Sequence, residues 1–262
     1  MSPSVGRVRH VILALVLLLA APLARAQESH AERLSVPWGV GERLEYQVSF
    51  GKLKVGSASM EVADVQNVRG HDTWHTVFEV HGGLKFVYHV DDTFESWIDR
   101  RTGNSLRFRK DQNEGHRDVE QNYEIFPERG VFTQTPSDSA RESVKNPLDD
   151  GSFLYFIRTI PLVVGQTYSF DRYFKPDRNP VTIKVVRKER IRVAGGEFDA
   201  IVVQPIINTP GIFSENGRAE VWLSDDKNRI MLQMKSGLSF GSINLYLTSY
   251  RPAPAAPAAQ TP

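Results

Sequence analysis

One short stretch carries the clearest helix signal after the N-terminal segment, and it limits what the rest of the chain can build. Asn146 is a candidate N-cap, and Pro147 suits the first helical position. Apolar residues then follow at the spacing of one helix face, namely Phe153, Phe156, Ile157 and Ile160. Pro161 ends this pattern, because the residue before a proline avoids the helical region. We therefore expect one amphipathic helix at about Asn146–Ile160.

Most of the remaining sequence has the alternation of apolar and polar residues that is typical of β-strands. Arg43–Phe50 and Ser242–Tyr250 both show it, and Ala194-Gly195-Gly196 is the clearest hairpin turn. Turn residues recur about every 8–12 residues, a spacing typical of sandwiches and barrels. Pro136–Lys145 is polar and predicts a surface loop before the helix. The prediction is an all-β fold, either a strongly curved antiparallel sheet or an open β-barrel, with the helix packed against it.

The N-terminal residues have the three-part pattern of a secretory signal peptide. Arg7 and Arg9 precede the apolar run Val11–Ala21, and Ala24-Arg25-Ala26 has the small residues of a cleavage site. Cleavage is expected between Ala26 and Gln27. The run is shorter than the roughly 20 residues that span a bilayer, so no stable membrane insertion is expected after cleavage. The predicted segments are a signal peptide at 1–26, a lead-in segment at 27–42, one β-rich domain at 43–251, and a disordered Pro/Ala tail at 252–262.

Charge and cysteine content exclude several classes of protein. The formal net charge of +1 becomes about −2 once the signal arginines Arg7, Arg9 and Arg25 are removed. This balance argues against nucleic-acid binding, which needs a clustered basic surface. The chain has no cysteine, which excludes a lipid-modified N-terminal cysteine, disulfides and thiol catalysis. We therefore expect an exported, soluble periplasmic protein that is not a lipoprotein.

Several segments together resemble a known bacterial family. In chain order they are GKLKVGSASMEV, SWIDRRTGNSLRFRK, NPLDDGSFLYFIRTIPLVVGQTY, KERIRVAGGEFDAIVVQP and AEVWLSDDKNRIMLQMKSGLSFGSINLYLTSY. Their order and spacing are similar to the exported proteins grouped as domain of unknown function 3108, from about Arg43 to Tyr250. The resemblance implies a single antiparallel β-rich domain, and it supplies no catalytic residues.

Two groups of polar residues suggest chemistry and have simpler explanations. His71, His75, His81 and His89 are too widely spaced along strands to share a metal ion, so we expect half-exposed strand positions and predict neither metal nor cofactor. The acidic clusters are Asp91-Asp92 with Glu95, and Asp149-Asp150. Paired carboxylates can hydrolyse glycosides across a cleft, although Asp149 and Asp150 also suit a helix N-terminus. A carboxylate-dependent hydrolase of envelope polymers therefore stays open as an alternative.

The aromatic content favours binding over catalysis. Aromatic residues are frequent around the helix and in the strands, where they either fill the core or line a cavity. We expect a non-enzymatic protein that binds an apolar small molecule or lipid, or an envelope protein. Phe153, Phe156, Ile157 and Ile160 would then form the wall or gate of the cavity. The first alternative, ahead of the hydrolase, is a structural or assembly factor that pairs with another envelope protein through a sheet edge.

Overall fold

The computed structural model describes residues 33–84, 88–208, 219–238 and 241–255. The predicted signal peptide, its cleavage site at Ala26 and Gln27, and the end of the Pro/Ala tail lie outside these ranges. The first strands are β1 (Arg43–Phe50), β2 (Leu53–Val68), β3 (His71–Leu84), β4 (Tyr88–Asp99), β5 (Ser105–Glu114), β6 (Arg117–Phe126), β7 (Val131–Gln134) and β8 (Ser137–Glu142). After helix α1 (Asp150–Phe156) come β9 (Thr167–Phe170), β10 (Val181–Val193), β11 (Gly196–Ile206), β12 (Glu220–Ser224), β13 (Met231–Leu238) and β14 (Gly241–Arg251). Two short 3₁₀ turns are η1 (Pro127–Arg129) and η2 (Pro176–Arg178).

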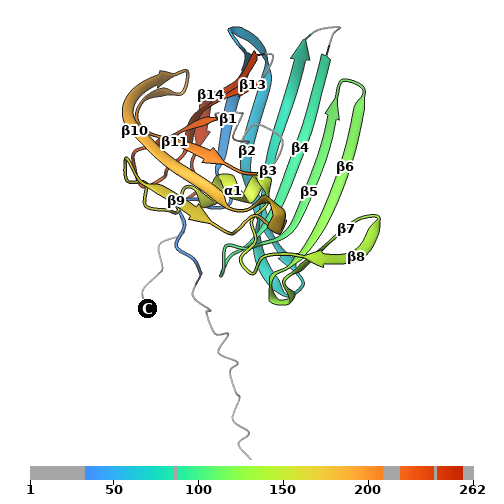
Figure 1. Ribbon diagram of the computed structural model, residues 1–262. Helices are drawn as coiled ribbons and strands as arrows, with labels where there is room; N and C mark the ends of the chain where they lie inside the picture. Colours follow the sequence, from blue (N-terminus) through green and yellow to red (C-terminus); the bar gives the residue numbers. More distant parts are fainter. Residues whose placement is uncertain (1–32, 85–87, 209–218, 239–240, 256–262) are drawn as a thin grey trace, which may run out of the picture. The chain divides into compact units, whose positions relative to one another are not determined.

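The described strands form one antiparallel sheet in the order β8-β7-β6-β5-β4-β3-β2-β1-β14-β13-β12-β11-β10-β9. The chain builds outward from β1 to β8, crosses through α1, and returns from β9 to β14 beside β1. The sheet stays open, because the described edge strands β8 and β9 pair only with β7 and β10. The sheet bends around α1, which packs on what we call the inner face (Figure 1). This arrangement confirms the predicted fold class.

Alternation along the strands separates the core from the outer face. Leu44, Tyr46 and Val48 of β1 are buried on the inner face. In the register, Tyr46 and Val48 lie opposite Leu247 and Leu245 of β14. Short turns fix the register of the hairpins. Strands β10 and β11 are joined at Ala194-Gly195, as predicted. Arg69 and Gly70 join β2 to β3 with φ angles of 52° and 88°, the conformation that two-residue hairpin turns require.

Helix α1 is shorter than the sequence predicts. The prediction of Asn146 as N-cap is wrong, because the backbone of Leu148 is already paired with the segment around Tyr173. The N–H of Leu148 donates to Arg172 O, and its carbonyl accepts from Phe174 N. Asp149 is the actual N-cap, and Ser152 completes a capping box. The helix ends at Phe156 instead of Ile160, and the residues that follow form tight turns.

Within the described ranges, no helix is long and apolar enough to cross a membrane.

Both edges of the sheet are short. The predicted loop Pro136–Lys145 contains β8, a six-residue strand of sequence SDSARE, so that prediction is wrong. At the other edge, β9 has four residues. Short and charged edge strands are the usual protection against pairing with a second sheet.

Candidate functional site

The four side chains predicted to wall a cavity lie on α1 and just after it. Phe153 and Ile157 are each 1% exposed, and Ile160 is also buried, all within one hydrophobic core. Phe156 is half-buried, with its ring 5.0 Å from that of Phe170 in an edge-on contact. The two pockets described below are lined by other residues. A ligand contact by these four residues therefore stays a prediction.

Asp149 connects α1 to the sheet. Its Oδ1 accepts a hydrogen bond from the hydroxyl of Ser96 (2.6 Å) and from the amides of Gly151 and Ser152. Its Oδ2 accepts from the hydroxyl of Ser105. Burial raises the pKa of Asp149 to about 6, although these donors act in the opposite direction. Its carboxylate is thus fully used in holding the helix in place.

Asp150 has a separate structural partner. It accepts a hydrogen bond from the hydroxyl of Tyr173 at 2.8 Å. Burial, and then the charge of Asp150, raise the pKa of this tyrosine hydroxyl well above its usual range. The structure therefore gives Asp149 and Asp150 separate contacts that position α1, which counts against a catalytic pair at this point.

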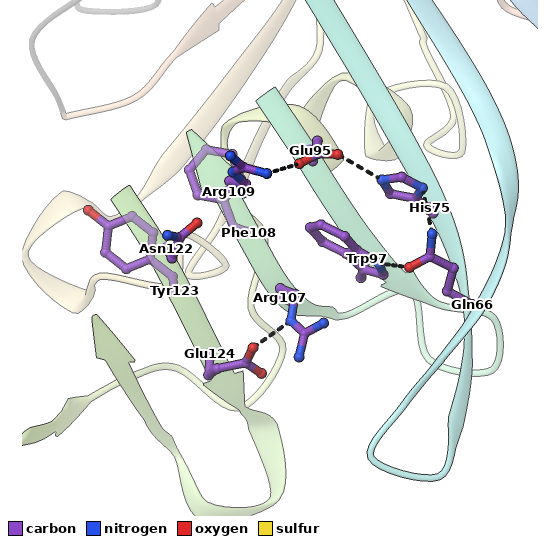
Figure 2. A pocket seen from close by; sticks show the side chains of 10 residues that line it. All are labelled: Gln66, His75, Glu95, Trp97, Arg107, Phe108, Arg109, Asn122, Tyr123 and Glu124. Atoms are coloured by element: carbon purple, nitrogen blue, oxygen red, sulfur yellow. Dashed lines mark hydrogen bonds and ion pairs between the residues drawn. The ribbon is translucent and has the colours of Figure 1, made fainter. Parts of the chain in front are cut away.

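A pocket of about 350 Å³ lies on the outer face of β2–β6 (Figure 2). The indole N–H of Trp97 donates to Gln66 (2.8 Å), whose amide lies 3.0 Å from His75 Nδ1. His75 Nε2 lies 3.3 Å from Glu95, which also faces Arg109. His75 is buried against Trp97, with ring centroids 4.6 Å apart, in contrast to the expected half-exposed position.

These contacts characterise the outer pocket as a network of paired groups. Arg107 bonds to Glu124 and lies 5.4 Å from the Trp97 ring, of which only 7% remains exposed. Little aromatic surface is therefore left for a ligand to stack on. In the described part of the chain, no three His, Asp or Glu side chains are arranged to hold a metal ion. A second outer pocket of about 310 Å³ lies on β11–β14, and its lining includes Gln204, Glu220 and Lys235.

The inner face carries a different surface. Phe78 and Val80 of β3 alternate with outer residues and share a face with Trp74, a core residue. Phe94 of β4 is two residues from Ser96, which bonds to the α1 cap, so Phe94 also lies on the inner face. Phe78, Val80 and Phe94 are only partly buried, and we call them the inner patch.

The inner patch is compact and apolar. Phe78 and Phe94 are opposite each other in the β3–β4 register, with ring centroids 6.0 Å apart. Met60 and Ala58 of β2 lie opposite Phe78 and Val80, and they are buried. Aromatic and aliphatic side chains thus extend over three neighbouring strands on the face that α1 covers only in part.

A buried carboxyl group borders the patch. Asp92 lies opposite Val80 in the register, is 5% exposed, and accepts hydrogen bonds from Gln112 (3.2 Å) and the amide of Asn113 (3.1 Å). Burial, and to a smaller degree the nearby charge of Glu114, raise the pKa of Asp92 to about 6.

The other members of this acidic cluster face away from Asp92. Asp91 bonds to His81 at 2.7 Å, and Glu95 faces His75 in the outer pocket. Successive strand residues point to opposite faces, so Asp92 is separated from both by the sheet. The structure does not bring Asp91, Asp92 and Glu95 together in one cleft.

A cation also borders the patch. Lys110 of β5 lies opposite Phe94, and its ammonium is 5.4 Å from the centre of that ring. Lys110 could not be recognised from the sequence, because it belongs to the polar strand SLRFRKDQNE, in which a solvated lysine is the ordinary expectation.

Replacing Asp92 with asparagine is expected to change how stability depends on pH. The folded pKa of about 6 lies above the value of about 3.9 for an unfolded aspartate, so the folded state binds more protons between these values. This contribution to stability is complete below about pH 4 and is lost as the pH rises through 6. The unfolding free energy of wild type minus that of Asp92→Asn should therefore fall between pH 4 and pH 7, measured by urea denaturation. A difference in unfolding free energy that stays constant across this range would contradict the raised pKa of Asp92. Asp149 is present in both proteins, so its contribution cancels in the difference.

Residues 45–248 match the family described as "Protein of unknown function (DUF3108)". The chain belongs to the DUF3108 family. No curated protein matches the chain. Membership agrees with the resemblance found in the sequence, and it assigns no reaction or ligand.

Two solved structures of bacterial proteins match most of the chain at low identity. A β-barrel-like protein of domain of unknown function DUF1849 from Brucella abortus is 12% identical, with a TM-score of 0.54, and the match covers 84% of this DUF3108 chain and 100% of that protein. A proposed exported protein with a YmcC-like fold from Bacteroides fragilis is 11% identical over 84% and 99% of the two chains, with a TM-score of 0.30. The first of these likenesses supports the barrel-like fold alone.

Proposed function

We propose that this DUF3108 protein is an exported binding protein that holds an apolar or amphiphilic ligand on the inner face of its sheet. The observation that carries the proposal is the inner patch, where Phe78, Val80 and Phe94 remain partly exposed on neighbouring strands beside the buried core. Apolar surface that gathers in one place on a soluble protein marks binding sites in many proteins. The periplasmic location rests on the signal-peptide pattern of residues 1–26.

Two observations favour this function over the alternatives. Pairing through a sheet edge needs a long and unprotected strand, whereas the described edges β8 and β9 are short and β8 is charged. Hydrolysis by paired carboxylates needs two acids that face one cleft, whereas Asp91 and Asp92 lie on opposite faces. An apolar ligand requires neither feature.

Binding of a neutral apolar probe tests the proposal. N-phenyl-1-naphthylamine fluoresces in apolar surroundings and should bind the purified mature protein saturably. Val80→Gln should weaken that binding by about tenfold, because it removes apolar contact worth roughly 1.5 kcal/mol. The matched control is Val77→Gln: Val77 is on the same strand, half-buried, and faces outward.

Two results would count against the proposal. One is an absence of saturable binding by a correctly folded protein. The other is an equal loss of binding in the Val80 and Val77 variants, which would place the probe away from the inner face. A copurifying apolar molecule, detected by native mass spectrometry of protein taken gently from its own periplasm, would name the natural ligand class.

A further inference from the structure

Charged side chains border the inner patch and limit which head group a bound ligand can carry. This inference rests on the proposed function. Lys110 is half-buried on the inner face, where holding an ammonium costs free energy unless a partner compensates it. Its recorded contact is the Phe94 ring, at 5.4 Å. Among the residues that the structure describes, no carboxylate lies within ion-pair distance of Lys110. Its charge is therefore available to a ligand that lies on the patch.

The position of Lys110 relates this charge to the apolar surface. In the sheet register Phe78 faces Phe94, and Phe94 faces Lys110, so the three side chains form one row across β3, β4 and β5. A ligand with its chain over the two rings would reach the ammonium at the end of the row. The next row places Val80, Asp92 and Gln112 side by side in the same order.

We propose that the ligand is an acyl chain with a carboxylate head, with the chain on Phe78, Val80 and Phe94 and the head at Lys110. One ammonium matches one negative charge. A doubly charged head such as a phosphate fits less well, because Asp92 and Glu114 lie on the same face and oppose a second negative charge. The side-chain amide of the neighbouring Gln112 already donates to Asp92. Lys110 is therefore the group that selects a ligand with a carboxylate head over an uncharged one.

Competition experiments test this assignment. Dodecanoate, dodecanol and dodecyl phosphate each compete with bound N-phenyl-1-naphthylamine on the full mature protein. Dodecanoate should bind tightest, and Lys110→Gln should weaken it by about tenfold while it changes dodecanol by less than about twofold. The control is Lys235→Gln, which removes a lysine that also lies over an aromatic ring (Trp222, 5.1 Å) on the outer face. That variant should bind all three compounds as wild type does.

The outcomes separate the two proposals. Equal binding of dodecanoate and dodecanol, or equal losses in the Lys110 and Lys235 variants, would overturn the carboxylate assignment and leave an apolar site. Tighter binding of dodecyl phosphate would overturn the choice of a singly charged head. Failure of all three compounds to displace the probe would place the bound probe elsewhere and count against both proposals.

Discussion

Replacing Arg158 with methionine is expected to lower the free energy of unfolding by about 3–5 kcal/mol, because it leaves a buried carboxylate without its partner. Glu42 is 1% exposed and Arg158 is 4% exposed. The two guanidinium N–H groups donate to the two carboxylate oxygens at 2.6 and 3.0 Å. Urea denaturation of wild type and Arg158→Met at pH 7 measures the difference directly.

The large effect follows from what Arg158 joins. Its guanidinium also donates to the carbonyls of Asn228 (2.9 Å) and Pro37 (3.4 Å). It lies 5.4 Å from the Trp38 ring and 5.8 Å from the ring of Tyr155. One side chain thus connects the end of α1, the segment before β1 and the β12–β13 turn. Its loss would leave the Glu42 carboxylate buried without a partner, and it would remove one donor from each of the half-buried carbonyls of Asn228 and Pro37.

Two controls show whether burial is the cause. The double variant Glu42→Leu with Arg158→Met removes both charges and should recover most of the loss, as replacement of a buried pair by apolar residues generally does. Arg192→Met breaks an ion pair with Glu197 whose arginine side chain is 81% exposed, and it should cost less than about 1 kcal/mol. If Arg158→Met costs no more than Arg192→Met, the pair does not have the buried character described here.

Features set by neighbouring residues could be predicted from the sequence. The alternation in Arg43–Phe50 and the Ala194-Gly195 turn depend on strand geometry and backbone conformation, which a few adjacent residues determine. The ends of the helix could not be predicted in the same way. Asn146 and Asp149 are both good capping residues, and the choice between them depends on the pairing of Leu148 with a segment 25 residues away.

The candidate site was harder to predict for a related reason. Phe78 and Phe94 have the same alternation as any core residue, and their partial exposure depends on which distant segments cover them in the fold. Glu42 and Arg158 are separated by 116 residues. The residues around each of them do not indicate that the two side chains form an ion pair. Helix periodicity identified an apolar stripe on α1, but it could not show whether protein or ligand would cover that stripe.

Replacing Phe153 with alanine is the second change with a large expected effect, about 3–5 kcal/mol of unfolding free energy, because it opens a cavity in a closed core. Phe153 is 1% exposed on the side of α1 that faces the sheet. Phe156→Ala should cost less than about 2 kcal/mol, because Phe156 is half-buried and its truncation exposes less apolar surface than that of Phe153.

Probe binding by the same two variants tests whether the stripe is core or ligand wall. If Phe153 is only core, the folded fraction of Phe153→Ala should bind N-phenyl-1-naphthylamine with an unchanged dissociation constant, whereas Val80→Gln weakens it. If the α1 stripe walls the ligand, both phenylalanine variants should change probe affinity, and the site would extend from the inner patch to the helix. The two measurements are independent, because stability reports the packing of α1 on the sheet and affinity reports the surface that the ligand contacts.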